Sequence, residues 1–372
     1  MPLSEIVGLI LIFFVGSVLL TDILLLFFLK GDSSKDIATC LFDETNLPRV
    51  SVLVAARNEE ATLSRCIESL LNQQYPADKI EILIGNDAST DKTEVIARSF
   101  EKERSQLKVF NIDHDMGSAR GKANVLAQLA RAASGEIYLI TDADMSLPPT
   151  WCKAMVAAFE KDTGMVTGYT AINENSLFAS FQAIDWAYAI GMMKVVSDLG
   201  MPVTGMGNNM AVLAKAYHQT GGYENMPFSV TEDFQLTRAI LSRGYGFKQL
   251  ISPAVTGITL PAAGIKGLLH QRKRWMSGAL QLPVAIVAVL GLQAIYYPLA
   301  VVLIVFYPWS ILLVAAKGVV QSWFVCRTVR LSALPVKIGA IVLFEFYSAI
   351  ISLSTLLFSL LPSGIKWKDR HY

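Results

Sequence analysis

Two aspartates, Asp142 and Asp144, stand one residue apart directly after a short apolar run. Residues 137–141 are four apolar residues and a β-branched threonine, which predicts a buried strand that ends in these carboxylates. Side chains at positions i and i+2 of an extended segment point the same way, so the two aspartates can face one ligand. Paired carboxylates suit Mg²⁺ or Mn²⁺, which bind a few carboxylates together with substrate phosphates. The alternative is a turn whose aspartates cap the following helix.

Short apolar runs alternate with helical stretches before this pair. Strands are predicted over residues 49–56, 79–85 and 107–112, and each is followed by a polar loop that opens a helix. This alternation favours a parallel sheet covered by helices on both faces. The sequence contains neither a G-x-G-x-x-G motif nor a P-loop motif, so it predicts neither of these nucleotide sites.

Charged residues follow the ends of the predicted strands. The carboxyl ends of parallel strands meet at one rim, where open α/β sheets bind their ligands. We therefore expect Arg57, Asp87 and Lys122 to share a crevice with the two aspartates. Asp87 can accept hydrogen bonds from a base or ribose, and Lys122, near a helix N-terminus, can meet phosphate. For Arg57 and Lys122 the alternative is a solvated surface charge.

Three later stretches carry further candidate residues. Residues 175–199 predict a long helix rich in aromatics and methionine, which is either core packing or the floor of an acceptor pocket near the membrane. A second helix is expected to begin at Thr231, with Glu232 and Asp233 in its first turn, where acidic residues are also ordinary stabilisers. Residues 271–275 stand directly before a long apolar stretch, and their basic and aromatic side chains can equally be an interfacial anchor.

The composition indicates a membrane protein. Apolar residues make up 53% and charged residues 17% of the 372 positions, which is too apolar for a purely soluble chain. The net charge is +1, so nucleic acid is not a predicted partner. Four cysteines without a C-x-x-C pair are expected to be unpaired thiols in a reducing compartment.

Membrane segments are predicted at both ends of the chain. Residues 6–29 predict an uncleaved anchor, and Lys30 and Lys35 after it favour a cytoplasmic middle region by the positive-inside tendency. Residues 276–316 carry no charged side chain and are too long for one span, so a break is expected at residues 291–298, as a hairpin or a re-entrant piece. Residues 338–361 predict a further span. The total is three or four spans, and four is favoured.

Two ionisable residues, Asp22 and Glu345, fall inside the apolar segments, where a charge is costly. They are either a polar lining for an acceptor path or carboxylates that are protonated or snorkel near the interface. The predicted organisation is an anchor over residues 1–30, a cytoplasmic domain over 31–275, and a membrane domain over 276–372. The last of these contains two or three spans and a short basic tail.

The order of four polar motifs carries a family resemblance. The motifs are Asn86-Asp87-Ala88-Ser89, Asp142-Ala143-Asp144, Thr231-Glu232-Asp233 and Gln271-Arg272-Lys273-Arg274-Trp275. This series resembles the D, DxD, TED and QxxRW motifs of membrane-bound family 2 glycosyltransferases over about the whole chain. It is similar both to processive polysaccharide synthases and to ceramide glucosyltransferases. Two positions depart from the pattern: Asn86, where many relatives have a second aspartate, and Ala88, where glycine is common.

The resemblance implies an α/β GT-A fold, Rossmann-like with a mostly parallel sheet, in a cytoplasmic domain flanked by transmembrane α-helices. It also implies a nucleotide-sugar donor, most often a UDP-sugar, with Asp87 at the uracil or ribose. Asp142 and Asp144 would hold the diphosphate through Mg²⁺ or Mn²⁺, with Asp144 as the direct ligand, and Asp233 would be the general base. The residues implied for the acceptor and the diphosphate are Glu232, Gln271, Arg274 and Trp275.

These implied roles describe an inverting sugar transfer at the cytoplasmic surface of a membrane. Asp233 would take a proton from an acceptor hydroxyl, while the metal and Arg274 neutralise charge on the departing diphosphate. Three or four spans favour a lipid acceptor over a growing glycan, because a polymer synthase needs a channel for its product. A processive exopolysaccharide synthase is the alternative, and an inactive membrane scaffold or a small transporter are more distant ones.

Overall fold

The computed structural model describes residues 2–32, 46–282, 284–335, 337–361, 366–367 and 370–371. Lys35 and Cys40, which entered the predictions above, lie outside these residues. The chain divides into two compact units. The helical unit comprises Met1–Lys30, Glu174–Val195 and Pro261–Tyr372, and the sheet unit comprises Gly31–Asn173 and Val196–Leu260. Within the described residues the cysteines Cys66, Cys152 and Cys326 are free thiols, as predicted.

The sheet unit is built on one mostly parallel sheet, which in the described part of the chain has seven strands in the order β3-β2-β1-β4-β7-β5-β8. Only β7 runs against its neighbours β4 and β5. The predicted strands at 49–56, 79–85, 107–112 and 137–141 are confirmed to within a residue or two as β1 to β4. The strand bounds are β1 Val50–Ala56, β2 Ile80–Asn86, β3 Leu107–Asn111, β4 Ile137–Asp142, β5 Thr163–Thr167, β7 Asn209–Leu213 and β8 Gly246–Gln249.

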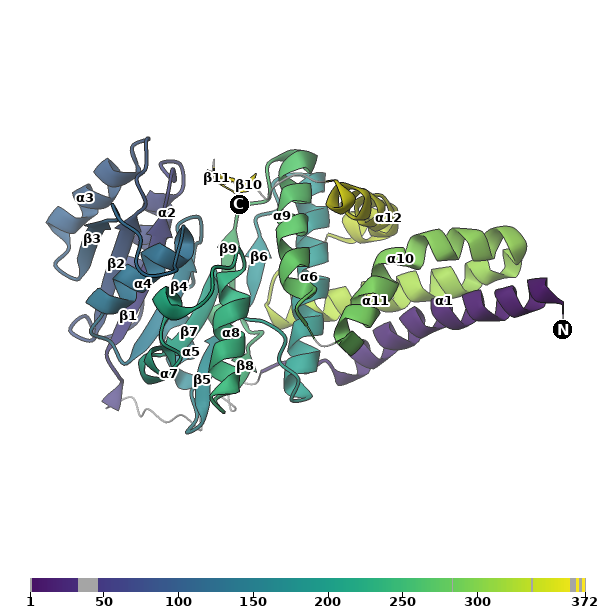
Figure 1. Ribbon diagram of the computed structural model, residues 1–372, viewed down its shortest axis with the longest axis horizontal. Coiled ribbons are helices and arrows are strands. Elements are labelled where there is room, and N and C mark those ends of the chain that lie inside the picture. Colours follow the sequence, from purple (N-terminus) through teal and green to yellow (C-terminus); the bar gives the residue numbers. More distant parts are fainter. Residues whose placement is uncertain are drawn as a thin grey trace. The chain divides into compact units, whose positions relative to one another are not determined.

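Helices cover both faces of this sheet (Figure 1) because alternate strand residues point to opposite sides. In β1, Val52 and Val54 enter one hydrophobic core and Leu53 enters the other. The first core is closed by α2 (Leu63–Leu71), α3 (Thr93–Glu103) and α5 (Trp151–Ala157). The second is closed by α4 (Lys122–Ala132), α7 (Ala214–Gln219) and α8 (Glu232–Ser242). Each fully buried aliphatic side chain contributes about 1.5–3 kcal/mol, so the two cores hold the strand ends at a fixed rim.

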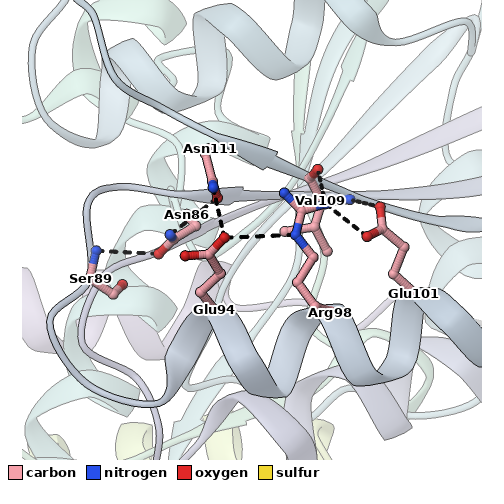
Figure 2. A network of polar contacts seen from close by, with 7 residues as sticks. All are labelled: Asn86, Ser89, Glu94, Arg98, Glu101, Val109 and Asn111. Atoms are coloured by element: carbon pink, nitrogen blue, oxygen red, sulfur yellow. Dashed lines mark hydrogen bonds and ion pairs between the residues drawn. The ribbon is translucent and has the colours of Figure 1, made fainter.

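The edge strand β3 is protected by side chains from α3 (Figure 2). The Val109 N–H donates to Glu101 Oε1 at 2.8 Å, and Arg98 Nη1 donates to the Val109 carbonyl at 3.0 Å. Arg98 and Glu101 also form an ion pair at 2.8 Å. Open backbone groups on an edge strand are a template for unwanted pairing, and at Val109 this template is covered.

The helical unit contains the apolar segments that the sequence predicts. By length and composition, four helices among the described residues could cross a membrane, which agrees with the favoured count. Helix α1 packs against α10 and α11 through a shared apolar cluster that includes Val15 and Leu303 (Figure 1). The helix bounds are α1 Leu3–Phe28, α6 Leu177–Asp198, α9 Gly264–Ala279, α10 Val284–Phe306, α11 Ile311–Leu331 and α12 Ile338–Leu360.

The break predicted at residues 291–298 is wrong. Helix α10 runs through this segment with Pro298 inside it, and the chain turns instead at the short helix η5 (Pro308–Ser310). The tyrosines that suggested an interface serve packing: Tyr296 is 2% exposed and joins the apolar cluster with α1. A proline inside a helix removes one backbone hydrogen bond. Long apolar helices accommodate this loss where they pack against neighbouring helices.

Asp22 and Glu345 both have partners inside the helical unit. Asp22 is fully buried, and its Oδ1 accepts a hydrogen bond from the Tyr188 hydroxyl at 2.5 Å. Gln293 Nε2 donates to the same hydroxyl at 3.0 Å. Lys317 Nζ lies 3.2 and 3.3 Å from the two carboxylate oxygens of Glu345. These side chains come from five different helices, so the polar contacts tie the apolar bundle together from within.

Candidate functional site

The predicted site residues of the sheet unit lie where the strands end. Arg57 and Asp87 directly follow β1 and β2, and Asp142 is the last residue of β4. Lys122 is the first residue of α4, the helix that follows β3. The strands β1, β2 and β4 are mutually parallel and adjacent, so their carboxyl ends form one rim, as the sequence predicted.

Lys122 joins two carboxylates that are far apart in the sequence. Its Nζ lies 2.6 Å from Asp142 Oδ1 and 3.2 Å from Glu232 Oε1, and it donates to the Gly207 carbonyl at 3.0 Å. The lysine side chain is 11% exposed. Burial alone would lower the pKa of Lys122, but the charges of Asp142 and Glu232 raise it above its usual value. The ammonium is therefore charged at physiological pH, and the alternative of a solvated surface charge does not apply to it.

Asp233 is oriented by its own helix and by the glycine-rich loop of residues 205–208, which precedes β7. The Gly207 N–H donates to Asp233 Oδ2 at 2.9 Å, and the Phe234 N–H donates to Oδ1 at 2.8 Å. A Cβ on residue 207 would lie 3.0 Å from this side chain, a contact so tight that the loop or Asp233 would have to shift. Thr231 takes the N-cap position of α8 but makes no side-chain capping bond.

The environment of Asp233 favours a proton acceptor. Burial and the nearby charge of Glu232 raise the pKa of Asp233 to about 6, against the lowering effects of Lys122 and of the two backbone hydrogen bonds. Tyr223, from the segment before α8, lies within electrostatic range of the same carboxylates. A carboxylate with such a pKa is ionised near neutral pH and can still take up a proton.

Asp144 is held by residues that the sequence did not indicate. Thr259 Oγ1 donates to Asp144 Oδ2 at 3.0 Å, and the Arg65 guanidinium donates to the Asp144 backbone carbonyl. Thr259 is the last residue of β9 (Gly257–Thr259), which pairs with β6 (Thr170–Ile172), while Ser146 forms a bridge with Ile258. Neither Arg65 nor Thr259 stands in a recognisable motif, because both contacts join segments remote in sequence.

The donor set of Asp142 and Asp144 fits a hard divalent cation that is shared with phosphate. Burial and the charge of Asp142 raise the pKa of Asp144 to about 6, and a cation between two close carboxylates would offset that repulsion. In the described parts of the chain, no group of three or more His, Cys, Asp or Glu side chains could hold a metal alone. The remaining ligands would have to be phosphate oxygens and water.

The loops after β1 and β2 are joined by reciprocal hydrogen bonds. The Asn58 N–H donates to Ser89 Oγ at 3.1 Å, and the Thr90 N–H donates to Asn58 Oδ1 at 2.9 Å. Arg57 Nη1 donates to the Asp87 carbonyl at 2.7 Å and lies 4.0 Å from its carboxylate. These bonds fix the backbone around Asp87 before any ligand binds.

Two residues in these loops have left-handed backbone conformations, which carry strain outside glycine. Asn58 has φ of 51° and Ala88 has φ of 49°. Asparagine tolerates this conformation, whereas alanine pays about 1 kcal/mol or more. The structure therefore explains why glycine is common at position 88 in the family that the chain resembles.

Asn86 is the other departure from the family pattern, and both the oxygen and the nitrogen of its side-chain amide form hydrogen bonds (Figure 2). Its Oδ1 accepts from the Ser89 N–H at 3.3 Å, and its Nδ2 donates to Asn111 Oδ1 at 3.3 Å. Asn111 Nδ2 in turn donates to Glu94 Oε1 at 2.7 Å. Asn86 thus ties the loop after β2 to the end of β3 and to α3.

The remaining predicted residues lie in the helical unit, on α9. These residues are Gln271, Arg274 and Trp275. The Trp275 ring lies 5.4 Å from the Trp186 ring of α6 and 5.0 Å from the Arg272 guanidinium. Arg272 also pairs with Asp185 of α6. Their role toward a diphosphate or an acceptor stays a prediction.

Comparisons with known proteins agree with this architecture. The model of "Glycosyl transferase family 2" matches residues 51–214, and that of "Glycosyl transferase family group 2" matches residues 137–362. A mannosyltransferase from Pyrobaculum calidifontis, solved in complex with GDP-Man and Mn²⁺, is 20% identical and superposes with a TM-score of 0.60. That match covers 96% of this chain and 99% of the other. The predicted GT-A fold is confirmed.

Two curated relatives differ in what their names say they make. A beta-monoglucosyldiacylglycerol synthase from Nostoc sp. is 31% identical over 241 residues, which are 63% of this chain and 50% of the relative. A poly-beta-1,6-N-acetyl-D-glucosamine synthase from Staphylococcus epidermidis is 29% identical over 255 residues, which are 68% of this chain and 60% of the relative. The chain thus spans about half the length of the curated relatives it matches.

The strain at Ala88 leads to a stability prediction. Ala88→Gly removes the left-handed penalty and should raise the free energy of unfolding by up to about 1 kcal/mol, after the entropy cost of glycine in the unfolded chain. The measurement is thermal unfolding of the detergent-solubilised chain. Ala61→Gly in the neighbouring loop is the matched control, since φ of Ala61 is not positive, and it should lower stability. Equal losses in both variants would show that Ala88 is not strained.

Proposed function

The chain belongs to the family 2 glycosyltransferases, and from that premise we propose that it transfers a sugar from a UDP-sugar to a hydroxyl of a membrane lipid. The observation that carries the proposal is the cluster around Lys122. It brings the DxD carboxylate of Asp142 next to the start of α8, which holds Asp233. The carboxylates for a metal-bound diphosphate and for a general base thus meet in one unit.

The donor would bind along the rim of the sheet. Asp87, fixed by Arg57 and the joined loops, offers a carboxylate to the base or ribose. Lys122 stays charged although it is buried, so it would attract the diphosphate electrostatically from its place between Asp142 and Glu232. Asp142 and Asp144 would hold Mg²⁺ or Mn²⁺, which when bound neutralises charge on the diphosphate leaving group. A divalent cation is also present in the solved mannosyltransferase complex that shares the fold.

The reaction would be a single displacement with inversion. The acceptor oxygen forms a bond to the anomeric carbon as the bond from that carbon to the diphosphate oxygen breaks, and the nucleoside diphosphate leaves with the electron pair. Asp233 takes the proton of the acceptor hydroxyl on a carboxylate oxygen that the Gly207 and Phe234 N–H groups orient. No covalent sugar–enzyme intermediate is needed.

The acceptor is assigned to the lipid class on two observations. The described helices that could span a membrane are few for a channel, and one relative is named for a glycolipid product. We further propose that residues 31–275 form a cytoplasmic domain, since Lys30 follows the first span. The second candidate is a processive polysaccharide synthase, which the relative from S. epidermidis favours. An inactive scaffold would not need Asp142, Asp144 and Asp233 together.

The proposal predicts an organic-soluble product. Purified full-length protein in detergent, supplied with diacylglycerol, Mn²⁺ or Mg²⁺ and a panel of radiolabelled nucleotide-sugars, should move label into the chloroform phase. Chelation of the divalent cation with EDTA should stop the transfer, because the diphosphate charge is then uncompensated. An insoluble labelled polymer would establish the synthase instead, and no transfer with any donor would leave only the scaffold.

The base assignment predicts a pH profile and a mutant phenotype. Wild-type transfer should lose rate as pH falls through about 6, because a protonated Asp233 cannot accept the acceptor's proton. Asp233→Asn should lower kcat by about 10²–10⁴-fold and leave the donor dissociation constant nearly unchanged. Asp162→Asn, a surface substitution in the same unit, is the control. Full transfer by Asp233→Asn would refute the base.

A further inference from the structure

An open cavity of about 550 Å³ lies between the first turns of α6 and α12 in the helical unit. Its volume is in the usual range of small-molecule sites. Helix α6 and the residue before it contribute Ser176, Leu177 and Ser180, and α12 with its N-cap contributes Lys337, Ala340 and Leu343. The two helices also pack through a stacked Phe181–Tyr347 ring pair at 4.7 Å. The cavity is therefore part of the helical unit's own packing.

One side of the cavity is polar, and its charges cancel. Lys337 Nζ donates to the Glu174 carbonyl at 2.7 Å and lies 3.4 Å from the Glu174 carboxylate. It also reaches Ser180 Oγ at 3.4 Å, and this serine is 1% exposed. Lys337 is the single ionisable residue among those that line the cavity in the described structure. With Glu174 as its partner, the polar side presents hydroxyl, amide and ammonium groups but no net charge.

The other side is apolar and continues along the exposed face of α12. Leu177 and Leu343 are 54% and 45% exposed at the cavity. Beyond them the exposed side chains of α12 are all apolar for several turns, including Val342, Phe346 and Ile350. Helix α12 is one of the helices apolar enough to cross a bilayer. The exposed apolar face of α12 is therefore suited to contact with acyl chains.

We propose that this cavity binds the headgroup of an uncharged, hydroxyl-bearing lipid of the diacylglycerol class. The glycerol hydroxyl and ester oxygens would meet Ser176 and Lys337, while the acyl chains follow the apolar side of α12. A phospholipid is disfavoured because Lys337 is already paired with Glu174, whose carboxylate would repel a phosphate. That the bound lipid serves as acceptor rests on the proposed function; the binding itself does not.

Photolabelling without any sugar donor tests this site. The full-length protein in detergent is irradiated with photoactivatable diacylglycerol, and the labelled peptides are mapped by mass spectrometry. Label should appear at residues 175–180 and 337–343. Leu343→Trp fills the cavity and should reduce that label by about tenfold, the effect of roughly 1.4 kcal/mol. Leu353→Trp is the matched control, with the same residue type on the same helix at 46% exposure, and should label as wild type.

A charge variant provides an independent test. Glu174→Gln leaves Lys337 without its anionic partner, so the cavity gains positive charge. The ratio of labelling by photoactivatable phosphatidic acid to labelling by diacylglycerol should then rise by about tenfold. The inference is overturned if wild-type protein labels elsewhere, if both lipids label it equally, or if Leu353→Trp and Leu343→Trp behave alike. Correct labelling without transfer would refute only the enzyme proposal, and transfer without this labelling would refute only the lipid site.

Discussion

The buried ammonium of Lys122 is the constraint on which the candidate site depends. A charge at 11% exposure must be paired, and its partners are Asp142 from the end of β4 and Glu232 from the start of α8. The third contact, to the Gly207 carbonyl, holds the glycine-rich loop against both. Removing the lysine would leave two carboxylates facing each other. The site is thus organised by one cation before a metal or a donor arrives.

The strands and helices around Lys122 hold the loops of the site in fixed positions. Parallel strands bring the ends of β1, β2 and β4 to one rim, and cores on both faces keep these ends in place. On this rigid base the chain accepts backbone strain at Asn58 and Ala88, where reciprocal hydrogen bonds between the loops hold the conformation. Backbone strain that the surrounding structure maintains is frequent at binding sites whose residues are positioned before the ligand binds.

The strands and the acidic motifs could be predicted from the sequence because their signals are local. An apolar run that ends in a carboxylate indicates both a strand and the rim at which it ends, as for Asp142. The supports of the site could not be predicted in this way. Thr259 reaches Asp144 across more than a hundred residues of chain, and the close approach of Gly207 to Asp233 joins two segments that are also distant in sequence.

The same limit explains the wrong prediction in the membrane segments. Tyr296 resembles an interfacial tyrosine by its type and neighbours, and only its packing against α1 shows that it belongs inside the bundle. Asn86 is a similar case, since its hydrogen bond to Asn111 becomes visible only when β3 is placed beside β2. The type of a residue indicates which interactions its side chain can make. The fold decides whether the side chain makes them with a ligand or with a neighbouring residue.

The most direct test of the central claim is the dissociation constant of UDP in the presence of Mn²⁺, measured by isothermal titration calorimetry on wild-type and Lys122→Met protein. If Lys122 organises the site, the constant should rise by about tenfold or more, because the variant loses the positive charge that pairs Asp142 with Glu232 and leaves both carboxylates to repel the diphosphate. An unchanged dissociation constant in Lys122→Met would contradict the account.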